Sequence, residues 1–141
     1  METQFKILQI KELPFQVKHD VELTQEDMNN VKISFLIVLQ HRSSDNVIGL
    51  HTMVRYMHNE NDIILESGVT HIAMINDWDS IKNSNEAIKT STTIKELLGY
   101  ATAFISGLVY RQTDGCSLHN YFIPFIPSED LISNLKIEQV E

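Results

Sequence analysis

The chain has 141 residues, enough for one globular domain with a sizeable core and too few for two independent cores. Its formal net charge of −8 argues against nucleic acid or an anionic membrane as a partner, because both repel an acidic surface. The single cysteine, Cys116, cannot form an intrachain disulfide, which favours a reducing compartment.

The N-terminus lacks the basic and then apolar run of a signal peptide. The fourteen-residue stretch 97–110 carries no charged side chain, but a membrane-spanning helix needs about 20 residues. We therefore expect a soluble, cytoplasmic protein with no membrane insertion, folded as a single domain over 1–141.

The first segment, 4–17, has the composition of a strand that is interrupted at Pro14. Proline cannot donate a hydrogen bond to a sheet, so we expect an edge strand that ends or bulges at this point. Residues 18–30 are polar and acidic and predict a loop.

Three strands are predicted next, at 31–41, 46–58 and 63–75, each with apolar residues in alternation. Turn-forming residues separate them, so the pattern predicts an antiparallel meander. Pairing His41 with Asn46 would place nearly all the bulky apolar side chains of the first two strands on one face. The whole sheet is then expected to have four antiparallel strands and one strongly apolar face.

Residues 76–92 are polar and are expected to lie irregularly on the surface. Thr93-Ile-Lys-Glu96 matches a capping box, which predicts a helix from there to about Gln112. An irregular connector, 116–127, follows. Ser128 is a candidate cap for a short final helix from Glu129 to about Lys136, with Leu131, Ile132 and Leu135 on one side. The fold class is thus α+β, with one long and one short helix on a four-stranded antiparallel sheet.

The long helix has a broad apolar stripe that is expected to cover the sheet. Its opposite side carries Gly99, Ala103 and Gly107 at four-residue spacing. A glycine inside a helix costs about 1 kcal/mol relative to alanine, and small residues at this spacing allow another backbone to approach closely. The cover could be the chain's own connector or final helix. A second subunit is favoured, because one helix covers only about half of a four-stranded sheet. We therefore predict an oligomer interface at these three residues.

Candidate chemistry is sparse. Cys116 and His119 are three residues apart, but no second pair completes a tetrahedral metal site. Asp77 and Asp79 flank Trp78 in a segment that is better interpreted as a solvated loop. Phosphate-binding loops, nucleophile elbows and HExxH motifs are missing from the sequence. We expect no enzyme activity, no metal and no cofactor. The histidines considered as metal ligands and set aside are His19, His41, His51, His58, His71 and His119.

The connector is the most suggestive segment. Residues 118–126 hold six large apolar side chains, punctuated by Pro124 and followed by Pro127. The connector could simply fill the uncovered part of the sheet. Alternatively, it could wall a groove for an extended apolar peptide, because proline keeps a backbone extended and rigid aromatics provide contact area at low entropic cost.

Three stretches in the order found here resemble the SecB family of protein-export chaperones and its relatives. "ILQIKELPFQ" (7–16) looks like the opening strand of that family, and "YATAFISGLVYRQTDG" (100–115) looks like its long helix running into the crossover loop. "IPFIPSEDLI" (123–132) is similar to the proline-containing segment before its last helix. The order of strands, helix, loop and helix matches over essentially the whole chain.

This resemblance implies a homotetramer, a dimer of dimers, in which the long helices are sandwiched between sheets. It also implies an ATP-independent holdase that binds unfolded or export-bound polypeptides in apolar grooves beside the crossover loop and the last helix. The groove positions in this chain would be Tyr121, Phe122, Phe125, Ile126, Leu131 and Leu135.

Family members that deliver clients to the SecA motor present acidic residues on the sheet surface. Glu12 is acidic at a matching position, whereas Gln16 stands where the typical export chaperone has an acid. The resemblance therefore leaves SecA delivery open, together with service to an antitoxin in a toxin–antitoxin–chaperone system. Two other hypotheses remain: a dedicated adaptor that recognises one specific partner without general chaperone activity, and a small-molecule binder in the uncovered half of the sheet.

Overall fold

The computed structural model describes residues 4–18, 24–42, 44–59 and 61–140. Within these residues, one six-stranded sheet has the order β1-β5-β4-β3-β6, and β2 also pairs with β5. The strands are β1 (Phe5–Glu12), β2 (Gln16–Val17), β3 (Val31–His41), β4 (Val47–His58), β5 (Asp62–Ile75) and β6 (Leu135–Gln139). The helices are α1 (Gln25–Asn29), α2 (Trp78–Ile81), α3 (Asn85–Thr90), α4 (Thr92–Gln112) and α5 (Ser128–Ser133).

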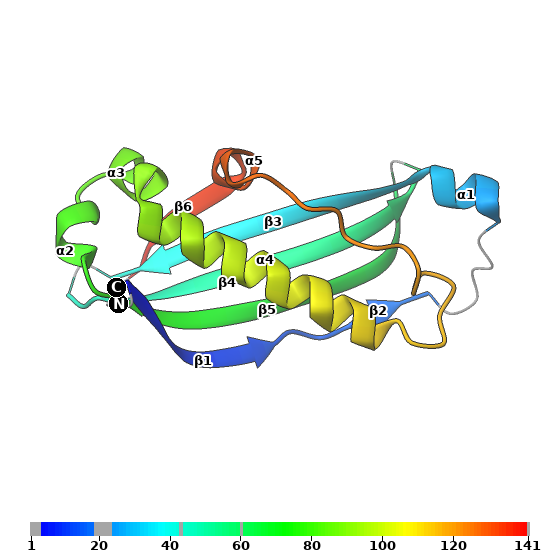
Figure 1. The fold of residues 1–141 in the computed structure, drawn as a ribbon, viewed down its shortest axis with the longest axis horizontal. Helices are drawn as coiled ribbons and strands as arrows, with labels where there is room; N and C mark the ends of the chain where they lie inside the picture. Colours follow the sequence, from blue (N-terminus) through cyan, green and yellow to red (C-terminus); the bar gives the residue numbers. More distant parts are fainter. Residues whose placement is uncertain (1–3, 19–23, 43, 60, 141) are drawn as a thin grey trace.

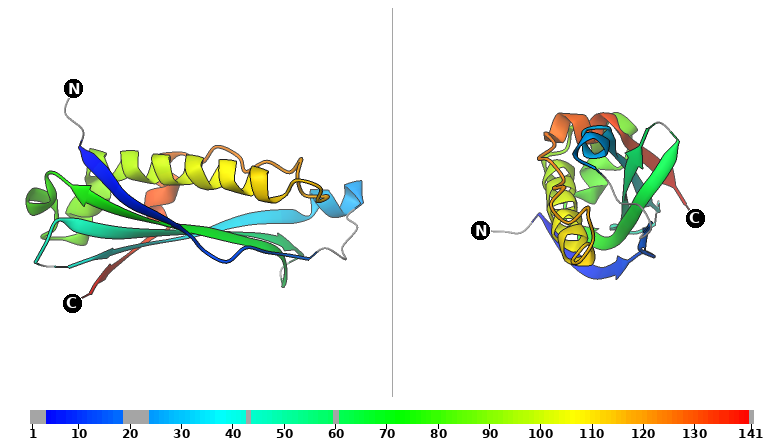
Figure 2. Two further views of the ribbon diagram at one scale, coloured as in Figure 1. Left: turned by 90° about the horizontal axis from the view of Figure 1, so that it is seen from below. Right: turned by 90° about the vertical axis from the view of Figure 1, so that its right-hand side faces the viewer.

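The long helix α4 crosses one face of the sheet (Figure 1). The connector that follows it returns over β4 and β3 on the same side, toward α5 (Figures 1 and 2). The core lies between α4 and the sheet and has two adjoining parts. Trp78, Leu50 and Leu97 belong to one part, and Tyr56 and Ile105 belong to the other.

The α+β class is confirmed, but the four-stranded sheet is wrong. The opening strand is divided at Pro14 into β1 and β2, which both pair with β5, and β1 is an edge strand as predicted. The further strand, β6, pairs in parallel with β3 from Ile37↔Leu135 to His41↔Gln139. The final helix therefore ends at Ser133 and does not continue to Lys136. Pro127, not Ser128, occupies the cap position of α5.

The expected pairing of β3 with β4 is displaced by two residues. His41 faces Ile48, and Val31 faces His58. An even displacement leaves every side chain on its expected face, so the single apolar face still forms. In β5, an irregularity in the pairing with β4 buries Ile64 and leaves Ile63 39% exposed, although the alternation placed Ile63 in the core.

Two segments expected to be irregular contain helices. The predicted loop 18–30 includes α1, and 76–92 includes α2 and α3. Trp78, expected in a solvated loop, is fully buried in the core. The cap of α4 also differs from the capping box at Thr93, because the Ser91 hydroxyl accepts a hydrogen bond from the Ile94 amide at 3.3 Å.

His71 of β5 is fully buried beneath α4, and neither ring nitrogen has a hydrogen-bond partner among the described residues. The rings of Tyr100 and Phe104 meet it edge-on at centroid distances of 5.5 and 5.2 Å. Burial lowers the pKa of His71 below its ordinary value of 6.5, and it does the same for His41. The folded chain therefore takes up these protons at lower pH than the unfolded chain does.

We predict that the free energy of unfolding is highest above about pH 6.5 and decreases as the pH falls below that value. His71→Leu should retain the stability of the wild type at pH 7.5, because no hydrogen bond is lost, and should reduce the loss of stability on acidification. Urea unfolding at pH 7.5 and pH 5 measures both effects. An equal acid dependence in the two proteins would contradict the assignment to His71.

Candidate functional site

The connector between α4 and α5 is tied down at one residue, Tyr121. Its hydroxyl donates to the Val31 carbonyl at 2.7 Å, and its own carbonyl accepts from the Tyr56 hydroxyl at 3.0 Å. The two tyrosine rings meet edge-on at 5.6 Å, and burial raises the pKa of Tyr56. The neighbouring Leu118 is buried in the same part of the core. These contacts attach the start of the connector to the end of the sheet.

Beyond this tether, residues 122–126 run extended beside α4 (Figure 1). Among the described residues, no main-chain group of 122–126 takes part in a hydrogen bond. Ile123 and Ile126 are half-buried against the core, whereas Phe122 is 65% exposed and Phe125 is 91% exposed. Apolar burial alone holds this segment, and it presents two aromatic rings to solvent.

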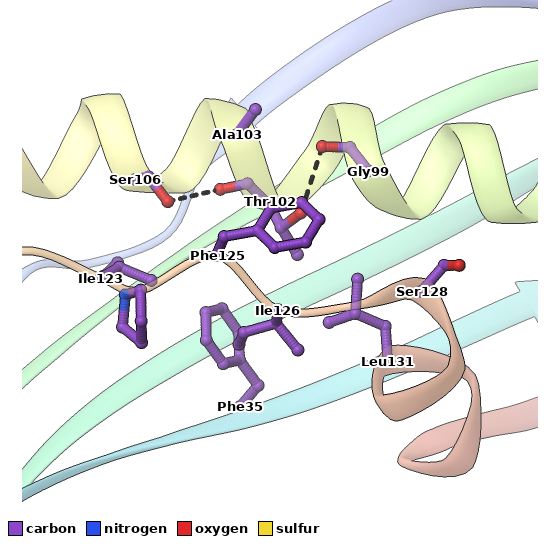
Figure 3. A pocket seen from close by; sticks show the side chains of 11 residues that line it. Phe35, Gly99, Thr102, Ala103, Ser106, Ile123, Phe125, Ile126, Ser128 and Leu131 are labelled. Carbon is purple, nitrogen blue, oxygen red and sulfur yellow. Dashed lines mark hydrogen bonds between the residues drawn. The ribbon is translucent and has the colours of Figure 1, made fainter.

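A groove lies between α4, this segment and β3 (Figure 3). It has a volume of about 390 Å³. The residues that line it are Phe35, Gly99, Thr102, Ala103, Ser106, Ile123, Pro124, Phe125, Ile126, Ser128 and Leu131. No charged side chain is among them.

A second hollow of about 170 Å³ adjoins the first, because both are lined by Ser106 and Ile123. Tyr110 stands at its rim, 52% exposed. Its ring contacts His119 at 4.3 Å and stacks with Phe122 at 6.0 Å between centroids. The two hollows together form one apolar channel along α4 that ends in an aromatic cluster.

Two hydroxyl groups of the groove wall, those of Thr102 and Ser106, do not need a ligand. Thr102 donates to the Leu98 and Gly99 carbonyls at 3.0 and 3.1 Å, and Ser106 donates to the Thr102 carbonyl at 2.8 Å (Figure 3). Each hydroxyl is therefore satisfied by its own helix. The wall offers methyl groups and helix backbone, and it suits an apolar occupant.

The predicted groove residues occupy different environments. Phe122, Phe125 and Ile126 line the channel, as expected from the connector's composition. Tyr121 lines the second hollow but also serves as the tether. Leu131 reaches the first hollow from the core and is 3% exposed, whereas Leu135 lies in β6 with 4% exposure and lines neither hollow.

Sequence reasoning did not identify Phe35 and Tyr110 as groove residues. Phe35 was assigned to the core because it alternates with buried positions of its strand. A usable signal existed for Tyr110, because Gly99, Ala103, Ser106 and Tyr110 recur at helical spacing on the side of α4 that faces away from the sheet.

The small-residue side of α4 is open. Gly99, Ala103 and Gly107 are exposed, and a Cβ atom added at Gly99 or Gly107 would meet no atom within 4 Å apart from its own helix and chain neighbours. The chain's own connector and final helix therefore do not cover these glycines. The second alternative, cover by another subunit, stays a prediction.

Glu12, the residue matched to an acidic position of the export chaperones, faces α4. Its carboxylate accepts a hydrogen bond from the Arg111 guanidinium at 2.7 Å. Gln16 pairs with Glu66 across β2 and β5. Glu12 is thus already engaged on the helix side of the sheet.

Across the described residues, no three histidine, cysteine or acidic side chains converge on one point, and His19 lies outside these residues. Among the described helices, none combines the length and apolar character needed to cross a membrane.

Comparisons with known proteins now bear on this architecture. No family model and no curated protein matches the sequence. Among solved structures, this one is similar to the Rv1957 SecB-like chaperone of Mycobacterium tuberculosis, determined in complex with a ChAD peptide from the Rv1956 HigA1 antitoxin. The TM-score is 0.57 over 87% of this chain and 90% of that chain, with 14% sequence identity. The fold is SecB-like. The resemblance inferred from the sequence is thereby confirmed at the level of the fold.

The tether can be tested through its hydroxyl. Tyr121→Phe leaves the Val31 carbonyl without its partner and should lower the free energy of unfolding by about 1 kcal/mol. Tyr110→Phe is the matched control, because no hydrogen bond of its exposed hydroxyl exists within the described residues, and it should change stability by less than about 0.5 kcal/mol. Equal effects of the two substitutions in urea unfolding would show that Tyr121 does not anchor the connector.

Proposed function

We propose that this protein is an ATP-independent chaperone that holds extended apolar segments of non-native polypeptides in the groove beside α4. The observation that carries the proposal is Phe125, a large aromatic side chain that is 91% exposed above a 390 Å³ apolar hollow. Exposed apolar patches of this kind mark interaction sites. We assign it no catalytic activity and place it in the cytoplasm.

The chemistry of the channel favours broad specificity. Its walls are mostly apolar, and the hydroxyls of Thr102 and Ser106 are satisfied within α4, which leaves few polar groups for a client. Binding free energy would come mainly from buried apolar area, at about 25 cal/mol per Å² before the costs of association are subtracted. With few directional contacts, such a site discriminates poorly between apolar sequences. The net charge of −8 would keep loaded complexes soluble and would favour basic clients.

The open side of α4 supports a homo-oligomer. Gly99, Ala103 and Gly107 form an exposed strip on which a second backbone could pack closely; Gly99 and Ala103 also line the groove, so a second subunit here would border it. The assembly that the sequence resemblance to the SecB family implies is a dimer of dimers with the α4 helices between the sheets. We do not include delivery of export clients to SecA, because Glu12 is occupied by Arg111 and Gln16 is uncharged.

A second candidate function is that of a dedicated adaptor for one partner, such as an antitoxin. The structurally similar Rv1957 chaperone was solved with a peptide from an antitoxin, which favours this candidate over other kinds of adaptor. The two functions separate in an aggregation assay. A holdase suppresses aggregation of several unrelated denatured proteins, whereas an adaptor protects none of them and binds its own partner.

The groove is tested by Phe122→Ser/Phe125→Ser. Both side chains are mostly exposed, so the double variant should keep the wild-type stability within about 0.5 kcal/mol. Removing two aromatic anchors of about 2 kcal/mol each should weaken the binding of an unfolded apolar peptide at least about tenfold. Fluorescence anisotropy measures the affinity, and native mass spectrometry verifies that assembly is unchanged.

Ile63→Ser is the matched control, because it removes an exposed apolar side chain that does not line the groove. Its peptide affinity should equal that of the wild type. A double variant that binds peptide as well as this control does would overturn the assignment of the groove.

The assembly is tested by Gly107→Leu. A side chain at this position meets open space within one chain, so the variant should fold. If the small-residue strip is an interface, the leucine should separate the subunits, and sedimentation velocity should show smaller species. Glu86→Leu, at an exposed position of α3, controls for added surface hydrophobicity. An unchanged sedimentation coefficient in Gly107→Leu would place the interface elsewhere.

A further inference from the structure

The face of the sheet opposite α4, here called the outer face, has an apolar centre. Leu36 pairs with Met53, and Gly49 pairs with Ile72. Along each strand these residues alternate with buried residues that point to α4, so they lie on the outer face. Leu36 is 38% exposed. The apolar residues of this centre are Leu36, Val38, Met53, Ile72 and Met74. No helix of the described residues crosses this face (Figure 2).

The strands themselves indicate that the outer face is covered in the working protein. An antiparallel strand with one solvated face alternates apolar and polar residues, whereas a strand covered on both faces is apolar throughout. Residues 35–39 of β3 read Phe-Leu-Ile-Val-Leu, and 72–75 of β5 read Ile-Ala-Met-Ile. The helix α4 accounts for only one side of these runs.

The charge of the outer face is opposite to that of the chain. Its outward-pointing strand residues include five cations, Lys6, Lys11, Lys32, Arg55 and Lys136, and two carboxylates, Glu66 and Glu138. Arg55 is neutralised by Glu66 at 2.6 Å. The four lysines are exposed and form no ion pair within the described residues. An acidic protein thus carries a local surface of unpaired positive charge.

This surface is held in place by hydrogen bonds. The ring of His51 contacts the Thr70 hydroxyl at 2.8 Å and the Gln40 side-chain oxygen at 2.9 Å, and Gln40 donates to Glu138 at 3.1 Å. The network crosses β5, β4, β3 and β6. One cross-strand row runs Lys11–Thr70–His51–Val38–Lys136, with a lysine at each end. By the strand pairing, this row lies between Leu36 and Met53 on one side and Ile72 and Met74 on the other, and its polar groups are fixed before any partner binds.

We propose that the outer face docks an acidic protein segment whose carboxylates meet the four lysines and whose apolar side chain covers Leu36 and Met53. The Leu36–Met53 pair beside fixed polar groups and exposed lysines combines apolar and polar contacts, as protein–protein interfaces do. Charge complementarity selects an acidic partner. A second copy of the same face is disfavoured, because its lysines would meet lysines. The site lies on the opposite side of the sheet from the client groove. The docking proposal can therefore be tested independently of the proposed holdase function.

The methionines make this face directly observable. Met53, Met57 and Met74 lie on the outer strand positions, and the described residues that line the groove include no methionine. The probe is a short peptide with glutamates flanking a Leu-Trp-Leu centre, and its counterpart has lysines in place of the glutamates. In the full-length protein with labelled methionine methyl groups, the acidic peptide should shift the NMR signals of Met53 and Met74, and the basic peptide should not.

Charge reversal then tests the lysines. Lys11→Glu/Lys136→Glu should weaken binding of the acidic peptide about five- to tenfold. The control Lys89→Glu/Lys95→Glu makes the same change in net charge at other sites and should weaken binding less than about twofold. Phe122→Ser/Phe125→Ser should leave the shifts of the Met53 and Met74 signals by the acidic peptide unchanged, which separates this site from binding of the same peptide in the groove. The proposal is overturned by unmoved Met53 and Met74 signals or by equal effects of the two lysine pairs. Displacement of the peptide by duplex DNA or anionic vesicles would also overturn it, because it would reveal a surface for polyanions in general.

Discussion

The structure depends on a mismatch of widths between one helix and one sheet. α4 is about 10 Å wide, whereas five neighbouring strands at about 4.8 Å spacing span about 20 Å or more. The buried residues of α4 pack on the middle of the sheet, and the helix leaves the β3 side of this face uncovered. The connector returns over that side, and its fit against α4 is incomplete. The apolar channel is the part of the sheet and helix that the chain cannot cover with itself.

The path of the connector follows from a few residues. Tyr121 is tied to Val31 and Tyr56 at one end, and β6 pairs with β3 at the other end of this segment. Pro124 and Pro127 lack the amide hydrogens that a further strand would need. The segment therefore cannot join the sheet, and Phe125 is left in solvent. The contacts and prolines that fix the path of the connector are therefore also what leaves its aromatic rings exposed.

Periodicity predicted the parts of the fold that local sequence controls. The meander, α4 and the apolar connector were all foreseen, because alternation and helical spacing are visible within each segment. The displaced β3–β4 register was not, since a shift of two residues leaves the alternation unchanged. β6 was missed because Leu131, Ile132 and Leu135 also fit one side of a helix, and its pairing with β3 joins residues such as Gln40 and Glu138, 98 positions apart. Phe35 belongs to the groove only because of where the connector runs, which no local pattern records.

The groove side of α4 and the outer face of the sheet both leave apolar surface uncovered. The central claim is therefore that other polypeptides cover surface that a single chain cannot cover by itself. Native mass spectrometry of the wild-type protein, with and without an unfolded apolar peptide, tests this claim most directly. The account predicts an oligomer with a mass that is a multiple of 16.2 kDa and that increases by whole peptides when the peptide is added. A particle of 16.2 kDa that takes up no peptide would contradict it.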